Sequence, residues 1–454
     1  MKSERATVEE PSHSGGKSIQ NILDNKSIRR TTTMTVGLLS TIWMIDMIDR
    51  VMIGLALPMI GDEFSLSNTQ LGGVVSIFAI FYMLGQVPGG MLADRFGPRP
   101  LLIVALILWS VFTALTGFAW GGLVSLMVMR AMFGLSQGLF PAASFKALAE
   151  RTRPKTRATA MGFMIGANNL GPPGIAPLII APVLMAVGWR DAFWLVAIVG
   201  AVIGTVVWLV LPAPLDTEIT EDPEAALQPL ASEHSRAAVF KSVSVWKFAL
   251  LFCLANMAGY GLLTWVPSYL LNEKGLSLID TGIFAAIPFI VTALAIVVGG
   301  RLVDKYFHDS ARILLVPCMA TSAILLFLMT TTDTVAMFTF YQTLAMGVSG
   351  LCSMSIFALP LRALPAEFLG SGMGLINGCG QLAGFITPLV MGWMVDQFSY
   401  MAAFGVLVGA TAAAALVAMI VPQTPGEILR ALTWSGEVAA EGSFPAVAAS
   451  PIRS

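Results

Sequence analysis

The chain has 454 residues, of which 56% are hydrophobic and only 12% are charged, and its mean hydropathy is +0.78. A soluble globular protein carries about 25% charged residues, so this composition excludes that class and indicates a membrane protein. The formal net charge of −1 gives no sign of a nucleic-acid partner.

Apolar windows long enough to cross a bilayer recur along the chain, separated by short polar or Gly/Pro-rich joints. A helix needs about 20 apolar residues to span the hydrocarbon layer. We therefore predict an all-α membrane protein with twelve transmembrane helices. The predicted spans are 33–58, 69–92, 99–118, 121–146, 158–183, 191–212, 246–271, 280–302, 312–331, 335–360, 370–394 and 400–421.

One long polar segment, 213–245, divides these spans six and six. The first 28 residues are polar and lack the short apolar core of a removable signal peptide. The predicted domain organisation is an N-terminal tail (1–32), a first six-helix half (33–212), a linker (213–245), a second half (246–421) and a C-terminal tail (422–454).

Basic residues cluster in the joints that a twelve-span chain places on one side of the membrane. The clusters are Arg29 and Arg30, Arg95 and Arg99, Arg151 to Arg157, and Arg301 to Arg312. Because Lys and Arg are enriched in short cytoplasmic loops, both termini are predicted to be cytoplasmic. The expected location is the plasma membrane, for a bacterium the inner membrane.

Two sequence stretches repeat between the halves. AMGFMIGANNLG, from Ala160, matches GMGLINGCGQLAG, from Gly372, and PGGMLADRFGPR at 88–99 is echoed by VGGRLVDKYFHDSAR at 298–312. Two related six-helix halves, with a central site between them near the midplane, form an architecture of transporters.

Charged residues interrupt the first span, in MIDMIDRVMIG at 44–54, and Arg130 lies in the middle of the fourth. An ionisable side chain at the bilayer centre costs about 2.5–3.5 kcal/mol on insertion scales, so it normally faces a cavity and pairs there. Asp46 and Arg50 have the i, i+4 spacing of an intrahelical ion pair, and Asp49 lies on the adjacent flank.

Two interpretations of these charges remain open. In the first, two arginines and two aspartates neutralise one another in a closed quartet that holds two helices together. In the second, Arg50 and Arg130 hold a carboxylate from two sides, because a guanidinium presents a rigid fork of donors. Asp46 and Asp49 would then carry the coupled proton, since an environment of low dielectric raises the pKa of a carboxyl group.

Other polar residues in the spans are candidates to line the same cavity and contact the substrate. They are Tyr82, Gln137, Asn168, Asn169, Tyr260, Trp265, Asn377 and Gln381. No cofactor or metal is expected, because the three histidines fall in a tail or in loops and the four cysteines fall in different spans. No nucleophile and base come together at membrane depth, so the chain is not expected to be an enzyme.

GGMLADRFGPR resembles the signature loop of the major facilitator superfamily. The stretches IDRVMIGLALPMIGDEFSLSNTQLG, FYMLGQVPGGMLADRFG, GLFPAA, GWRDAFWL and YGLLTWVPSYL resemble the anion:cation symporter family, which includes bacterial hexuronate, galactonate and glucarate transporters and animal sialin-like carriers. The D-x-x-D of Asp46 and Asp49 is also similar to the first-helix motif of aromatic acid:proton symporters.

The resemblance implies a twelve-helix fold and substrate contacts from Arg50 and Arg130. It also implies a conformational latch on the cytoplasmic face, made by Gly90, Asp94, Arg95, Arg99 and Asp304. Proton-coupled members carry an acid two turns after the helix-4 arginine, where this chain has Gln137, which cannot titrate. Either coupling has moved to Asp46 and Asp49, or the protein is a uniporter or exchanger.

We predict a monomeric secondary transporter that imports a small carboxylate, such as a sugar acid, together with protons by alternating access. The alternatives are an aromatic acid:proton symporter, an anion uniporter or exchanger, and, in a different class, a membrane sensor that binds the anion without moving it. A sensor is disfavoured because the sequence has no evident output domain.

Overall fold

The computed structural model describes residues 14–119, 121–153, 160, 163–164, 172–215, 241–306, 311–363 and 366–422. The placement of side chains is described from residue 26 onward, apart from 87, 94, 172–173, 303–306, 311, 354, 357–363 and 366–374. Asn168, Asn169 and most of the 213–245 segment lie outside the described residues.

Every described element is a helix. In chain order they are α1 (Ser14–Phe64), α2 (Asn68–Phe96), α3 (Pro98–Gly117), α4 (Gly122–Gly138), α5 (Phe140–Ala149), α7 (Pro172–Val210), α10 (Val243–Ser268), a π-helical turn (Tyr269–Glu273), α11 (Leu278–Tyr306), α12 (Ala311–Thr330), α13 (Val335–Ala363), α14 (Ala366–Gln397) and α15 (Tyr400–Ile420).

Local sequence explains where α2 begins. Ser67 is its N-cap, and the Ser67 hydroxyl accepts a hydrogen bond from the backbone of Gln70 while the Gln70 side chain accepts one from the backbone of Ser67. This reciprocal capping box satisfies two of the backbone groups that a helix start leaves free. It fixes the start of α2, a helix that packs on α14 of the second half.

The helix α7 contains two membrane-crossing arms. Gly188 has φ 79° and ψ 169°, a left-handed conformation that favours glycine, and it turns the chain between the arms. Pro177 of the first arm lines a void together with Ala285 of α11, whereas Arg190, just after the turn, donates a hydrogen bond to the last residue of α3. The arms therefore pack on different neighbours.

The predicted twelve-helix fold is confirmed. Ten helices in the described part are long and apolar enough to span a membrane, and α7 counts among them once although it crosses twice. The charged helix α1 supplies the remaining crossing. α1 starts at Ser14, so the helix extends well into the predicted N-terminal tail.

Large apolar side chains face outward along the helices, as a lipid environment requires. On α3, Val104, Ile107, Leu108 and Val111 are exposed, with the spacing of one helix face. The chain is a multi-pass membrane protein.

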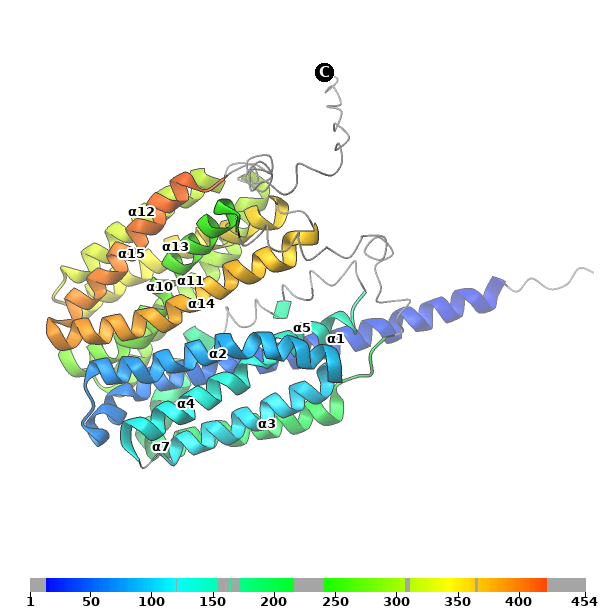
Figure 1. Ribbon diagram of the computed structural model, residues 1–454, viewed down its shortest axis with the longest axis horizontal. Helices are drawn as coiled ribbons and strands as arrows, with labels where there is room; N and C mark the ends of the chain where they lie inside the picture. Colours follow the sequence, from blue (N-terminus) through cyan, green and yellow to red (C-terminus); the bar gives the residue numbers. More distant parts are fainter. Residues whose placement is uncertain are drawn as a thin grey trace, which may run out of the picture.

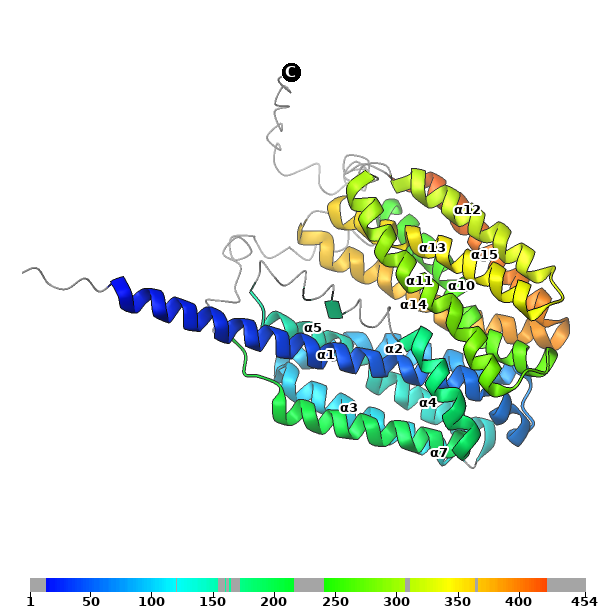
Figure 2. The ribbon, with the colours of Figure 1, turned by 180° about the vertical axis from the view of Figure 1, so that it is seen from behind.

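The helices form two bundles lying side by side, one from α1–α7 and one from α10–α15 (Figures 1 and 2). We call the end that carries the joints 65–67, 274–277 and 398–399 the outer end, because the basic-loop rule predicts that it faces away from the cytoplasm. The opposite end is the inner end. Across the boundary, α2 packs on α14, the first arm of α7 on α11, and α1 on α10.

The buried core changes along the bundle. At the outer end one continuous cluster joins the halves, with Met52 and Leu55 of the first packed among residues such as Leu262 and Trp265 of the second. Toward the inner end the described core divides into one cluster within each half. Among the described residues, the two halves therefore share one continuous buried core at the outer end, whereas the inner cluster of the first half contacts the second half through the partly buried Phe385 of α14.

The outer end is closed by close backbone packing between α2 and α14. A Cβ atom built on Gly72 would lie 2.3 Å from the carbonyl oxygen of Pro388, so only glycine permits this approach. The Asp396 carboxylate accepts hydrogen bonds from the backbone and side-chain nitrogens of Asn68, at 2.9 and 3.0 Å, at the start of α2. These contacts hold the outer ends of the two halves together.

Candidate functional site

The charged residues of the first span lie at the centre of the bundle. Asp46 and Asp49 on α1 are 1% and 0% exposed, and Arg130 on α4 is 2% exposed. Burial of four ionisable groups at membrane depth is costly unless they pair with one another or serve a ligand. The arrangement of the pairs therefore decides what the cluster can do.

The four groups form two separate ion pairs. Arg50 Nη2 lies 3.2 Å from Asp46 Oδ2, which is the i, i+4 pair that the sequence predicts. Arg130 Nη1 lies 3.5 Å from Asp49 Oδ2 and joins α4 to α1. Each contact uses one nitrogen of the guanidinium, so neither arginine is engaged in the two-pronged geometry that satisfies a carboxylate best.

Aromatic rings flank both guanidinium groups. Arg50 Cζ lies 5.1 Å from the ring centre of Phe78 and 4.6 Å from that of Tyr82, both on α2. Arg130 Cζ lies 5.3 Å from the ring centre of Phe133 and 5.2 Å from that of Phe193. Ring faces attract cations and leave the N–H groups at the guanidinium edge free to donate.

The two pairs differ in access. The Arg50 side chain is 12% exposed and its partner Asp46 is 2% exposed, whereas the Arg130 and Asp49 side chains are 3% and 0% exposed. Arg50 is therefore the more exposed of the two guanidinium groups in this conformation. The Arg130–Asp49 pair is shielded from solvent.

Many polar atoms of the cluster have no hydrogen-bond partner. They are Asp46 Oδ1, both Asp49 oxygens, Arg50 Nε, Arg130 Nε and Nη2, and both amide atoms of Gln137. Buried polar groups in folded proteins are nearly always hydrogen-bonded, so these atoms are donors and acceptors available to water, a proton or a ligand. The closed-quartet interpretation leaves these free donors and acceptors unexplained.

The second half contributes polar groups that face Arg50. Tyr260 on α10 lies close enough to Arg50 to interact with its charge, and it donates a hydrogen bond from its hydroxyl to Gln381 Oε1 on α14 at 2.8 Å. Tyr82 lies near both Arg50 and Tyr260. Arg50 thus sits at the boundary between the halves, with tyrosines from each half beside it.

The other predicted cavity residues are placed differently. Asn377 is exposed one turn from Gln381 on the same face of α14. Trp265 is 0% exposed and donates its ring N–H to the Pro388 carbonyl oxygen at 3.2 Å, so it packs in the closed outer end. Gln137 is 0% exposed, on the same helix as Arg130.

Four of the five predicted latch residues lie at the inner end of α2 and the start of α3, and Asp304 lies on α11 of the second half. Arg95 is exposed, with its guanidinium 5.2 Å from the ring centre of Phe96, and Arg99 donates a hydrogen bond to the Trp208 carbonyl oxygen at 2.7 Å. Gly90 lies on α2. The side chains of Asp94 and Asp304 lie outside the described part.

Sequence reasoning missed two features. One is Phe78, which stacks on Arg50 and lies one turn before Tyr82. The i, i+4 spacing of the two aromatic residues places them on the same face of the helix, so the sequence could have indicated Phe78 as well. Asp396 follows the end of the predicted span 370–394, and nothing in the sequence indicates that its partners lie in α2.

The chain is similar in sequence to known transporters. The family model of the Major Facilitator Superfamily matches residues 39–388. The chain is 30% identical over 400 residues to a hexuronate transporter of Bacillus subtilis (strain 168), covering 83% of this chain and 91% of that protein. It is 30% identical over 412 residues to a probable sulfoacetate transporter of Cupriavidus necator, covering 85% and 94%.

A solved structure has the same fold. A bacterial homologue of the human lysosomal transporter Spinster, in an inward-facing and unoccupied conformation, superimposes with a TM-score of 0.74 at 18% identity, covering 89% of this chain and 98% of that chain.

Proposed function

Because the chain belongs to the major facilitator superfamily, we propose that it imports a small organic anion, with a sugar acid as the first candidate, by proton-coupled symport. The chain is a secondary transporter and not an enzyme, as its transporter relatives establish. Its resemblance to the anion:cation symporters is confirmed by those relatives. The choice of substrate and the coupling are the proposal.

Arg50 carries the proposal. It is the more accessible guanidinium of the cluster, it keeps an unpartnered Nε, and it lies beside Tyr260 of the other half. A carboxylate bound there would gain charge-assisted hydrogen bonds from Arg50, while its hydroxyl groups would meet Tyr82, Tyr260 and Gln381. A ligand that touches both halves favours the state in which they close around it, which is how substrate binding drives alternating access.

Arg130 and Asp49 have a linked role in this proposal. While Asp49 is ionised it neutralises Arg130 in a closed pair. Protonation of Asp49 would remove that attraction and free Arg130 to take the second side of the substrate carboxylate. Proton and anion would thereby enter the site together, and Asp46 would act on Arg50 in the same manner.

The relatives support a carboxylate as substrate. The two relatives described above are named for hexuronate and sulfoacetate, and two further relatives are named as probable transporters of L-galactonate and of galactarate or D-glucarate. Each of these is a small anion with at least one carboxylate. One proton with a monoanion moves no net charge, whereas each additional proton gains about 2.3 kcal/mol from a membrane potential of 100 mV. Dianions such as glucarate therefore need two protons for electroneutral uptake.

Gln137 favours a second candidate, an anion uniporter or exchanger, because its amide cannot carry a proton. Uptake into proteoliposomes distinguishes the two. With an inward pH gradient and no voltage, symport accumulates hexuronate above its external concentration, and Asp46→Asn with Asp49→Asn abolishes that accumulation but not exchange. Uptake that stops at the external concentration, whatever the pH gradient, would leave the uniporter or exchanger.

The remaining parts of the proposal concern topology. We propose that both termini face the cytoplasm of a bacterial inner membrane, that the protein acts as a monomer, and that the halves are 33–212 and 246–421. Gly90, Asp94, Arg95, Arg99 and Asp304 would form a latch at the inner end that engages when that end closes. Protease accessibility in oriented vesicles tests the orientation.

A further inference from the structure

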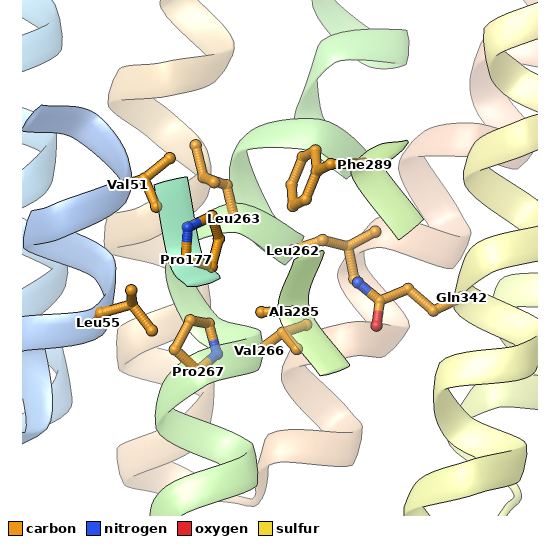
Figure 3. A pocket seen from close by; sticks show the side chains of 10 residues that line it. All are labelled: Val51, Leu55, Pro177, Leu262, Leu263, Val266, Pro267, Ala285, Phe289 and Gln342. Carbon is orange, nitrogen blue, oxygen red and sulfur yellow. The ribbon is translucent and has the colours of Figure 1, made fainter. Parts of the chain in front are cut away.

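A small void lies between the halves, next to the charged cluster on its outer side (Figure 3). Val51, the residue after Arg50, and Leu55, one turn further out, form one wall, and Leu262 and Val266 of α10 form another. The space open to the centre of a water molecule is about 10 Å³, which is the room that one ordered water needs. No whole substrate fits there in this conformation.

Of the ten residues that line the void, one has a polar side chain, Gln342 of α13. Gln342 is 1% exposed, and its carbonyl Oε1 has no hydrogen-bond partner. Its amide nitrogen has one weak contact, 3.9 Å from Met346 Sδ. Figure 3 shows the side chain reaching from α13 toward Leu262 of α10, which belongs to the same half and also lines the void. An amide buried in apolar surroundings without a partner is destabilising in this closed state.

The walls of the void belong to different halves, so the void exists only while the outer end is closed. Val51 and Leu55 move with α1, and Pro177 moves with α7, whereas Leu262 and Gln342 belong to the second half. When the halves separate at the outer end, this space becomes part of the passage that leads from outside to Arg50. Gln342 then offers a polar contact in an otherwise apolar stretch of wall.

We propose that Gln342 is an outer binding subsite, which holds an oxygen atom of the arriving carboxylate substrate before Arg50 captures it. This inference rests on the proposed transport of a carboxylate. The amide N–H₂ donates to a carboxylate or hydroxyl oxygen, and the free Oε1 accepts from a substrate hydroxyl. Hydroxylated acids use both ends of the amide, so Gln342 favours sugar acids over plain fatty or aromatic acids on the outer side.

The subsite predicts an asymmetry between the two faces of the membrane. In right-side-out and inside-out proteoliposomes, Gln342→Met keeps the side-chain length but removes the donor and the acceptor. We expect the KM for galacturonate presented to the outer face to rise about fivefold to tenfold, the loss of one hydrogen bond to substrate. The KM at the inner face and the maximal rate of influx should stay unchanged. Because net flux must vanish at equal concentrations on both sides, the maximal rate of efflux should fall by the same factor by which the outer KM rises. An unchanged outer KM, or an equal rise on both faces, would overturn the proposal.

A control variant separates the subsite from general loss of polar groups. Thr411 on α15 also has a buried hydroxyl without a partner, and it does not line the void. Thr411→Val should leave the KM on both faces at the wild-type value. A rise in outer KM equal to that of Gln342→Met would contradict a specific role for Gln342.

A second measurement does not depend on the substrate. In a Gln342→Cys variant, a membrane-impermeant maleimide applied from outside should label the new cysteine faster than any cysteine of the wild-type chain, because this position opens to the outer side. No labelling above the wild-type level would overturn the inference. If wild-type protein moves no carboxylate, the proposed function fails, and the labelling result still decides whether Gln342 lines the outer passage.

Discussion

The Asp396 carboxylate of α14 accepts hydrogen bonds from both the backbone nitrogen and the hydroxyl group of Thr69 on α2, at 2.6 and 2.5 Å. Thr69 belongs to the first turn of α2, whose free N–H groups and dipole attract negative charge. Since the two residues come from different halves, this contact stabilises the closed outer end. It must break whenever that end opens.

Removing the charge of Asp396 should shift the protein toward an open outer end. Asp396→Asn loses the attraction to the start of α2, and a charged hydrogen bond of this kind contributes about 1–3 kcal/mol. Spin labels on the outer ends of α2 and α14 should then report a larger fraction of long distances. Asp280→Asn is the matched control, because Asp280 pairs only with Ser277 of its own helix start among the described residues. Equal distance distributions in Asp396→Asn and Asp280→Asn would contradict the assignment.

Gly72 gives a steric test of the same closure. A methyl group in Gly72→Ala would lie 2.3 Å from the Pro388 carbonyl oxygen, so α2 and α14 cannot approach fully. Overpacking of this kind costs about 1–3 kcal/mol, and here the cost falls only on the closed outer end. We expect faster outside labelling of a cysteine placed in the interface, together with a reduced transport rate. Gly405→Ala, where a Cβ meets nothing within 4 Å, should behave as the wild type.

The Arg130–Asp49 pair predicts strong coupling between two variants. Arg130→Met alone leaves Asp49 buried without its counter-charge, and breaking a buried pair in this way costs about 3–5 kcal/mol. Asp49→Asn should recover most of that loss when combined with Arg130→Met, because no uncompensated charge remains. Thermal unfolding in detergent of the wild type, the two single variants and the double variant measures this coupling. Strictly additive effects would show that the two residues do not form the pair.

Gln137 permits a gain-of-function test. Gln137→Glu places a titratable group on the helix of Arg130, where free Arg130 nitrogens are available. We expect the number of protons moved with each substrate to increase by one, as measured from the voltage that stops net flux in proteoliposomes. Gln137→Leu is the control, which should change KM but leave the proton number at its wild-type value. An unchanged proton number in Gln137→Glu would place Gln137 outside the coupling machinery.

Much of the fold follows from local sequence. Runs of apolar residues fix the helices of the second half to within a few residues, since α12, α13 and α15 nearly coincide with the predicted 312–331, 335–360 and 400–421. The Asp46–Arg50 ion pair also follows from spacing alone, because residues four apart share a helix face. These features depend only on the sequence within a single helix and on the thickness of the bilayer.

Features that depend on how the halves meet were not predictable. Tyr260 and Arg50 are far apart in the chain, and only the packing of α10 against α1 brings them together. The unequal exposure of the Arg50 and Arg130 side chains, 12% and 3%, likewise depends on the packing of several helices, which a one-dimensional pattern does not encode. The same holds for Asp396, whose partners in α2 lie 328 and 327 residues away.

Direct binding of a carboxylate through Arg50 tests the central claim most closely. Calorimetric titration of the purified protein with glucuronate, galacturonate and glucarate should show saturable binding of at least one acid. Arg50→Met should abolish that binding, whereas Arg190→Met, which changes an arginine paired with Glu63 away from the cluster, should preserve it. Equal affinity in the wild type and Arg50→Met, or no binding of any of these acids to the wild type, would contradict the account.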